Sequence, residues 1–398
     1  MENTATARTN IVDMAVKWLR QNLQASTIIV AMLAIWISIS IWTEGSFLLP
    51  QNISNLIRQM TVTAILSVGM VLIIVLGNID LSVGKFAGCI SVIVAYLQYY
   101  TWYTLIPDNP ILAAALSVII GLLFGILFGV IQASVIAFMN VPSFIVTLGF
   151  MWIFNGAIIA ITEGKSIPSD QPYFNYIGQG YLPAWLGWVL GILAILALFY
   201  MKFRSRIQKN KNGFENQNVL IDIIQPTLYS ILIIAYIYIV NLYNGLQMPV
   251  LILAVVAVVI GYLATNTPFG RYIYAIGGNK EAARLSGINI RFVIFMATAM
   301  MGLLCGISGI TLASYVGAGT IAAGTGYELD AIAATILGGT STLGGKGSIG
   351  FALVGALIMA SITNGLQIMN IGPAWQYMVK GLVLIVAVFA DVYFNKNR

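Results

Sequence analysis

The chain has 398 residues, of which 59% are hydrophobic and 8% carry a charge, and its formal net charge is +6. Soluble domains carry roughly 25% charged residues, so this composition excludes an ordinary soluble protein and indicates an integral membrane protein in a lipid bilayer. The sequence contains no histidine, the commonest metal ligand and general base, and its positive charge falls in short loops. We therefore expect no metal site, no cofactor and no nucleic-acid partner.

Residues 1–24 form a polar, basic arm, and the apolar run 27–43 that follows is long enough to cross a bilayer when tilted. No small-residue cleavage pattern follows it, which indicates an uncleaved first helix rather than a signal peptide. The shorter run 331–338 ends in two glycines and is interpreted as a broken crossing. The remaining apolar runs fall at about 61–76, 86–100, 111–138, 142–161, 182–201, 219–242, 246–264, 292–314, 350–369 and 375–394.

Together these runs predict about twelve crossings, one of them the short broken helix. None of the runs alternates between apolar and polar residues as a strand does, so we predict an all-α, polytopic helical bundle rather than a barrel. Residues 25–398 are expected to form a single transmembrane domain.

Lysine and arginine predict the orientation, because the cytoplasmic loops of membrane proteins carry an excess of these residues. Placing every basic cluster inside requires an even number of crossings before each, and the apolar runs provide it. Both termini then face the cytoplasm, and Lys165 lies outside. The basic residues assigned to the inside are those of the N-terminal arm and Lys202, Arg204, Arg206, Lys209, Lys211, Arg271, Lys280, Arg284, Arg291, Lys396 and Arg398.

A polar, glycine-punctuated stretch, 265–291, separates two long apolar runs on the predicted cytoplasmic side. The residues expected to break any helix that enters it are Pro268, Gly270, Gly277 and Gly278. Asn279 then caps a short helix over Lys280–Ser286, and Gly287 ends it with a positive φ. A short helix with small apolar residues and a charged rim suits docking against another protein, and the alternative is an ordinary cytoplasmic loop.

Glycines carry two further patterns. Gly121, Gly125 and Gly129 are spaced four apart and predict close packing of two helices, as do Gly302, Gly306 and Gly309. A nucleotide site would need a phosphate-binding loop of the form G-x-x-x-x-G-K-[ST]. The stretch Gly339–Ser348 has Thr340 in place of the first glycine and Gly347 in place of the final serine or threonine. It is more simply a tight turn, and any energy from ATP must come from a separate subunit.

Several motifs resemble the sugar branch of ABC-importer permeases, and GGNKEAARLSGI resembles their coupling loop. The other motifs are NISNLIRQM (52–60), GNIDLSVG (77–84), VPSFIVTLG (141–149), GQGYLPA (178–184), ELDAIAATILGGTSTLGGKGSIG (328–350) and WQYMVKG (375–381). That branch handles ribose, xylose, galactose and arabinose. The motif GQGYLPA and an extra hydrophobic pair ahead of the coupling loop resemble its D-xylose-specific members.

The resemblance implies a subunit of the bacterial plasma (inner) membrane with no ATPase site of its own. Two copies would sit on two ATPase subunits and receive a monosaccharide from an extracytoplasmic sugar-binding protein. The residues that match the ATPase-coupling loop are Asn279, Lys280, Glu281, Ala282, Ala283, Arg284, Leu285, Ser286 and Gly287.

Asp80 lies in GNIDLSVG, between two apolar runs, and a lone carboxylate in or near the bilayer marks a cavity, a partner or an interface. One interpretation is a discontinuous helix that borders the translocation route, with polar groups from Asn78, Asp80 and Ser82. The other is a capped cytoplasmic turn in which Asp80 caps a helix that begins at Leu81. Asp330 would likewise cap 331–338, and Glu328 would be solvated.

Two classes of function stay open. The first is the permease of an ABC importer, and the second is a secondary sugar carrier driven by ions. Secondary carriers hold charged residues at mid-membrane and show repeats between their halves. Here the apolar runs are nearly free of charge and show no strong internal repeat, which favours the permease.

Overall fold

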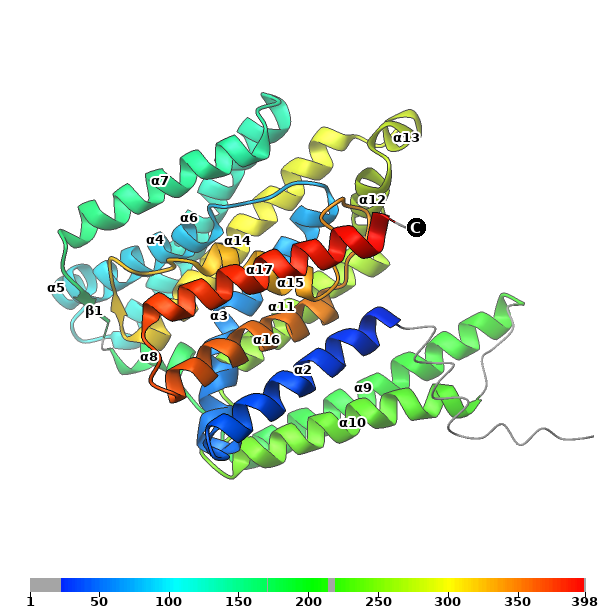
Figure 1. The fold of residues 1–398 in the computed structure, drawn as a ribbon. Coiled ribbons are helices and arrows are strands. Elements are labelled where there is room, and N and C mark those ends of the chain that lie inside the picture. The colour runs from blue at the N-terminus through cyan, green and yellow to red at the C-terminus, as the bar shows by residue number, and fades with distance from the viewer. Residues whose placement is uncertain (1–22, 170, 214–218, 397–398) are drawn as a thin grey trace, which may run out of the picture.

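The computed structural model describes residues 23–169, 171–213 and 219–396 and shows a bundle of helices (Figure 1). The predicted N-terminal arm lies outside these residues except for its last two positions, and Arg398 lies outside them as well. The longer helices are α2 (Leu23–Trp42), α3 (Pro50–Val75), α4 (Val83–Tyr96), α6 (Pro110–Phe138), α7 (Ser143–Thr162), α9 (Ala184–Lys211), α10 (Val219–Asn241), α11 (Met248–Asn266), α14 (Ile290–Val316), α16 (Ile349–Ile368) and α17 (Pro373–Lys396).

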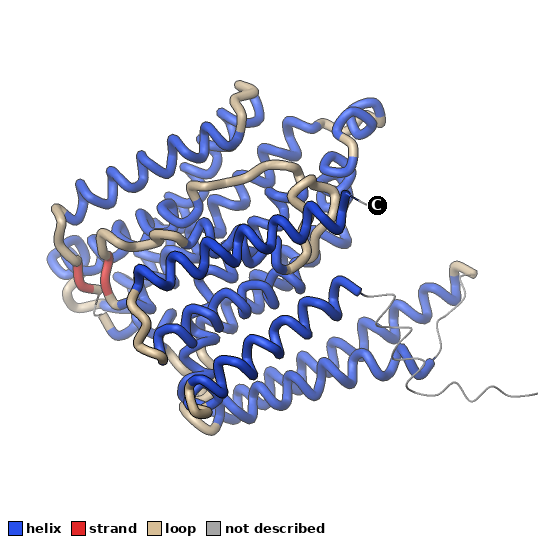
Figure 2. Tube along the Cα trace, viewed as in Figure 1, coloured by secondary structure: helices blue, strands red, loops and turns tan. Residues whose placement is uncertain are grey.

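The shorter elements lie at the two ends of the bundle and in its middle. They are η1 (Ser46–Leu48), a π-helix (Leu97–Trp102), α5 (Tyr103–Leu105), α8 (Pro172–Gln179), α12 (Pro268–Gly278), α13 (Lys280–Leu285) and α15 (Tyr327–Leu337). In the part of the chain that the structure describes, the strands are limited to β1 (Ile167–Pro168) and β2 (Ala318–Gly319), which pair antiparallel (Figure 2). The predicted all-α class is therefore confirmed.

Nine of the described helices are long and apolar enough to cross a membrane. Three further elements complete the predicted set of about twelve crossings. The first is α2, whose apolar part is Thr27–Trp42. The second is α4, which continues through the π-helix and α5 as one helical stretch. The third is the short helix α15.

The core of the bundle is α3, which is buried along nearly all of its length and is surrounded by α11, α14, α15 and α16. The predicted glycine faces meet between α6 and α14. A Cβ added at Gly125 would lie 2.6 Å from the carbonyl oxygen of Gly302, which is closer than real Cβ atoms come. The helices approach this closely only because both residues lack a side chain, as the spacing predicted.

The hairpin of α9 and α10 lies at the edge of the bundle, where α10 contacts α3 (Figure 1). Its basic end is held by Asp222 of α10, whose carboxylate lies 3.4 Å from Lys202 Nζ and 2.5 Å from Arg206 Nη1. Figure 1 places this basic end of α9 on the same side of the bundle as α12, α13 and the C-terminal end of α17.

The broken crossing begins in the middle of the bundle. After β2 the chain runs along α4, so that Gly319 packs against Val92, and Gly324 packs against Gly84. The thiol of Cys305, near the middle of the membrane-crossing helix α14, donates to the Val83 carbonyl, so the start of α4 and the Gly324 that packs on it lie about halfway through the bundle. Helix α15 therefore starts near mid-membrane depth, four residues before the apolar run that predicted it.

Candidate functional site

The predicted coupling stretch contains two helices. Thr267 caps α12, since its Oγ1 accepts a hydrogen bond from Gly270 N at 3.4 Å, and Pro268 is the first helical residue. The helix that enters the stretch, α11, ends at Asn266 just before Pro268, as predicted. Gly278 is the last residue of α12, but Gly270 and Gly277 lie inside α12 and do not break it. These two permit close contact instead: a Cβ at Gly270 would meet the Ala264 carbonyl.

The helix predicted from Asn279 is present as α13. Asn279 Oδ1 accepts a hydrogen bond from Ala282 N at 2.9 Å, which is the predicted cap. The helix ends at Leu285, one residue earlier than predicted, and Ser286 follows as its C-cap. Gly287 has φ +81°, so the predicted left-handed stop is confirmed.

One side of α13 faces the rest of the chain. Ala283 is only 4% exposed, whereas Leu285 is 79% exposed. Ala283 therefore packs inside the chain, and the small residue available to a docked partner is Ala282. Glu281 and Arg284 form an exposed ion pair, which contributes at most about 1 kcal/mol.

Helix α12 rests on the C-terminal end of α3 and on the predicted tight turn 339–348. Gly345 N donates to the Val75 carbonyl at 2.9 Å, and the Tyr274 hydroxyl donates to the Gly347 carbonyl at 2.9 Å. A Cβ at Gly277 would clash with the Val75 carbonyl, so this glycine is needed for the contact. The turn is thereby fixed between α12, α3, α15 and α16.

The turn is also tied to α17. The backbone nitrogen and the hydroxyl of Thr342 both donate to Asp391 Oδ2, at 2.9 Å and 2.8 Å. Gly339, Gly344 and Gly345 have φ values of +80°, +87° and +73°, which residues with a side chain adopt poorly. The turn is thus shaped by its glycines and held from several helices.

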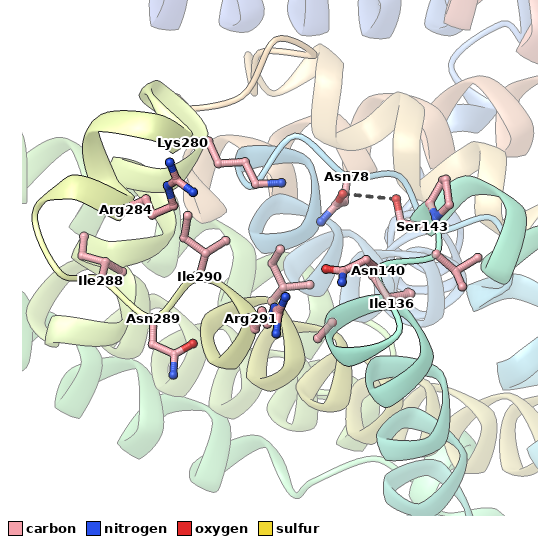
Figure 3. A pocket seen from close by; sticks show the side chains of 14 residues that line it. Asn78, Ile136, Asn140, Ser143, Lys280, Arg284, Ile288, Asn289, Ile290 and Arg291 are labelled. Carbon is pink, nitrogen blue, oxygen red and sulfur yellow. Dashed lines mark hydrogen bonds between the residues drawn. The ribbon is translucent and has the colours of Figure 1, made fainter.

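A pocket of about 490 Å³ opens beside α13. Figure 3 shows Lys280, Arg284 and Arg291 on one side of it and Asn78 and Ser143 on the other. Asn78 Oδ1 accepts a hydrogen bond from the Ser143 hydroxyl at 3.2 Å. The described residues that line the pocket include three basic side chains and no acidic one. The structure therefore brings one predicted pathway residue beside two predicted coupling residues, which sequence reasoning treated separately.

The other two predicted pathway residues lie inside the protein. Asp80 is 3% exposed and Ser82 is fully buried. Asp80 Oδ1 accepts hydrogen bonds from Ser82 N at 2.8 Å and from the Ser82 hydroxyl at 2.6 Å, and Gln132 donates to that hydroxyl at 3.0 Å. The helix begins at Val83, not at Leu81, so Asp80 holds the turn before it.

A cluster of charges that the sequence analysis missed lies where α4, α15 and α17 meet. Lys380 Nζ forms an ion pair with Asp330 Oδ2 at 2.8 Å. Lys85 Nζ donates to the Thr325 hydroxyl at 2.7 Å and is attracted by the charge of Glu328. We call Lys85, Thr325, Glu328, Asp330 and Lys380 the mid-membrane cluster.

The expectation that Glu328 is solvated is wrong. Its side chain is half-buried, and its Oε2 is buried without a hydrogen-bond partner. The expectation that the apolar runs are nearly free of charge also needs correction. Lys380 lies inside the run 375–394, and its presence there was the signal that an acidic partner had to be sought.

At the end of the bundle opposite α13, the GQGYLPA motif (178–184) is held against the start of α11 and against α3. Leu182 N donates to the Leu246 carbonyl at 2.8 Å, and Met248 N donates to the Gly180 carbonyl at 2.9 Å, which holds the motif at the start of α11. Arg58 of α3 donates to the Tyr181 hydroxyl, and its guanidinium lies 5.0 Å from the centre of that ring. The motif therefore forms an ordered part of this surface.

Comparison with known proteins identifies the family. Residues 52–388 match the family described as "Branched-chain amino acid transport system / permease component". The chain is 40% identical to the xylose transport system permease protein of Escherichia coli (strain K12) over 93% of this chain and 92% of that relative. It is 37% identical to the xylose transport system permease protein of Haemophilus influenzae over 95% of this chain and 98% of that relative. The ribose import permease protein of Bacillus subtilis (strain 168) is 32% identical over 87% of this chain and 86% of that relative.

No solved structure matches the chain. The family match covers most of the sequence, and the curated relatives are similar over nearly their whole length. The chain therefore belongs to the family of branched-chain amino acid transport system permease components and is a polytopic membrane permease.

Proposed function

We propose that this chain is the permease subunit of an ATP-driven importer that carries D-xylose into the cell. The observation that carries the proposal is the identity of 37–40% to xylose permeases over more than nine-tenths of the chain. The ribose permeases compared with it are less similar, at 31–32% identity. The extra hairpin of α9 and α10 agrees with the resemblance to D-xylose-specific members that the sequence motifs indicated.

The working unit in this proposal has two copies of the chain, two ATPase subunits and an extracytoplasmic sugar-binding protein. It lies in the bacterial inner membrane with both termini in the cytoplasm. The support is the position of the basic residues: those of α9 and those of α12 and α13 lie at one end of the bundle, and Lys165 lies in the loop after α7. ATP is hydrolysed by the partner subunits, since the stretch 339–348 serves as a structural turn.

The coupling helix in this proposal is α13, which the ATPase would push. Its contacts offer two routes into the membrane. The first runs through the pocket to Asn78, and from there through the turn 76–82 into α4. The second runs through α12 to the glycine turn and from there into α15. Both routes end at the mid-membrane cluster, so a movement of α13 would be transmitted to the place where α4 and α15 begin.

Deleting the gene tests the sugar. We expect uptake of labelled D-xylose to be lost and to return when the gene is supplied on a plasmid, while uptake of ribose and galactose stays unchanged. Loss of ribose or galactose uptake with intact D-xylose uptake would contradict the assignment.

A second arm of this experiment distinguishes an importer driven by ATP from a carrier driven by ions. Inactivating the partner ATPase should abolish uptake, whereas an ionophore that collapses ion gradients, at constant cellular ATP, should leave it intact. The opposite pattern would favour the carrier. This arm is needed because the mid-membrane cluster places charges in the bilayer, as ion-coupled carriers also do.

A further inference from the structure

Three polar groups of the mid-membrane cluster are not enclosed by the chain. Thr325 is exposed, and Lys85 and Glu328 are half-buried. Asp330 and Lys380 form an ion pair whose side chains are less exposed, at 9% and 20%. The cluster therefore has an inner part, Asp330 and Lys380, that ties α15 to α17 and an outer part, Lys85, Thr325 and Glu328, that is only partly covered by the chain.

The outer part cannot face lipid. Charged side chains near the centre of a bilayer are costly, and they face a bundle interior or a water-filled cavity. Glu328 adds a second observation, because its carboxylate and the Lys85 ammonium attract each other, so the outer part holds one charge of each sign.

The backbone around Glu328 is built from close glycine contacts. A Cβ at Gly84 would clash with Glu328 Oε2 and would lie 2.6 Å from the Gly324 carbonyl. Gly84 therefore leaves the room that the carboxylate occupies. The place is also where α4 and α15 both begin inside the bundle, and substrate sites of transporters form near the midplane at such discontinuous helices.

We propose that Lys85, Thr325 and Glu328 contact the hydroxyl groups of the sugar as it passes the middle of the membrane, an inference that rests on the proposed sugar transport. Each sugar hydroxyl both donates and accepts a hydrogen bond. The Glu328 carboxylate accepts, Lys85 Nζ donates, and the Thr325 hydroxyl can do either. This sugar-contact site, the station formed by Lys85, Thr325 and Glu328, suits an uncharged polyhydroxylated ligand, because the lysine and the carboxylate offset each other's charge.

Chemical labelling tests whether water reaches the station. In the assembled transporter, Thr325→Cys should react with a charged, membrane-impermeant thiol reagent. The native cysteines, Cys89 and Cys305, are 1% and 0% exposed and should stay silent. The control is Leu382→Cys on α17, which is 63% exposed and lies two residues from Lys380, on the opposite side of the helix.

We expect labelling at 325 to be at least about tenfold faster than at 382, since a charged reagent is excluded from hydrocarbon. Millimolar D-xylose with its binding protein should slow labelling at 325 only. Equal rates at the two positions would overturn the proposal, and so would fast labelling at 325 that D-xylose leaves unchanged.

Transport of sugar analogues tests the contact itself. Glu328→Gln keeps the shape of the side chain but weakens a hydrogen bond to a charged acceptor, so D-xylose transport should fall about tenfold. For the monodeoxy xylose that lacks the contacted hydroxyl, Glu328→Gln and the unaltered chain should transport at the same rate. The same binding protein is used throughout, so its own selectivity cancels in the comparison.

Asp330→Asn is the matched control, because it breaks the neighbouring ion pair. It should lower the transport of every analogue by the same factor. If Glu328→Gln behaved in this way too, Glu328 would be structural and the proposal would be wrong. If the sugar assignment itself were wrong, the result would differ from both of these outcomes, because the unaltered complex would transport no D-xylose at all.

Discussion

Gly287 offers a sharp test of the coupling helix. Its φ of +81° lies in the left-handed region, which a β-branched residue adopts poorly, and a Cβ added there would meet no atom within 4 Å. Gly287→Val therefore adds conformational cost without a steric clash. That cost is about 1–2 kcal/mol, which corresponds to a 5–30-fold loss in the population of the capped α13.

We expect Gly287→Val to lower D-xylose uptake by about that factor while the protein reaches the membrane at its normal level. The matched control is Gly287→Asn, since asparagine tolerates the left-handed region and should leave uptake close to normal. The assay is initial uptake of labelled D-xylose, together with co-purification of the ATPase. Equal loss in both variants would refute a backbone cause, and normal uptake in Gly287→Val would show that α13 need not end there.

Three further predictions follow from the contacts. Ala282→Trp, on the exposed side of α13, should lower co-purification of the ATPase without changing the amount of folded permease; unchanged co-purification would place the docking surface elsewhere. Asp330→Asn should lower the free energy of unfolding by about 3–5 kcal/mol, because it leaves the Lys380 charge buried without its partner. In that background Lys380→Met should restore part of the loss in a thermal melt, and no recovery would argue against the ion pair. A cysteine introduced at Lys165 should react with an impermeant reagent from outside the cell, and one introduced at Lys280 should react only from inside. Reaction at 280 in intact cells would reverse the topology.

Much of the coupling region could be predicted from sequence because it depends on local chemistry. The Asn279 cap and the left-handed Gly287 are set by residues within a few positions of each other, and both predictions were confirmed. The predicted breaks at Gly270 and Gly277 failed for a physical reason. Glycine is disfavoured inside a helix, but here it is needed for contact with backbone carbonyls that lie elsewhere in the chain, such as that of Val75.

The mid-membrane cluster could not be predicted from sequence for the same reason, since it depends on contacts between distant parts of the chain. Lys380 and Asp330 are separated by a turn and a whole helix, and Lys85 and Thr325 are far apart in sequence. Hydropathy treats each of them as one charge beside an apolar run, whereas the folded chain makes them partners. The burial of Ala283 could not be predicted either, because α13 is too short for its periodicity to reveal which side packs against the protein.

The central claim is that this chain carries D-xylose only when a separate ATPase drives it. The most direct measurement is D-xylose accumulation in proteoliposomes that contain the purified permease, its ATPase and the sugar-binding protein. We predict accumulation that requires ATP on the ATPase side, persists when ionophores abolish proton and sodium gradients, and stops when the ATPase is omitted. Accumulation driven by an ion gradient in vesicles that contain the permease alone would contradict the account.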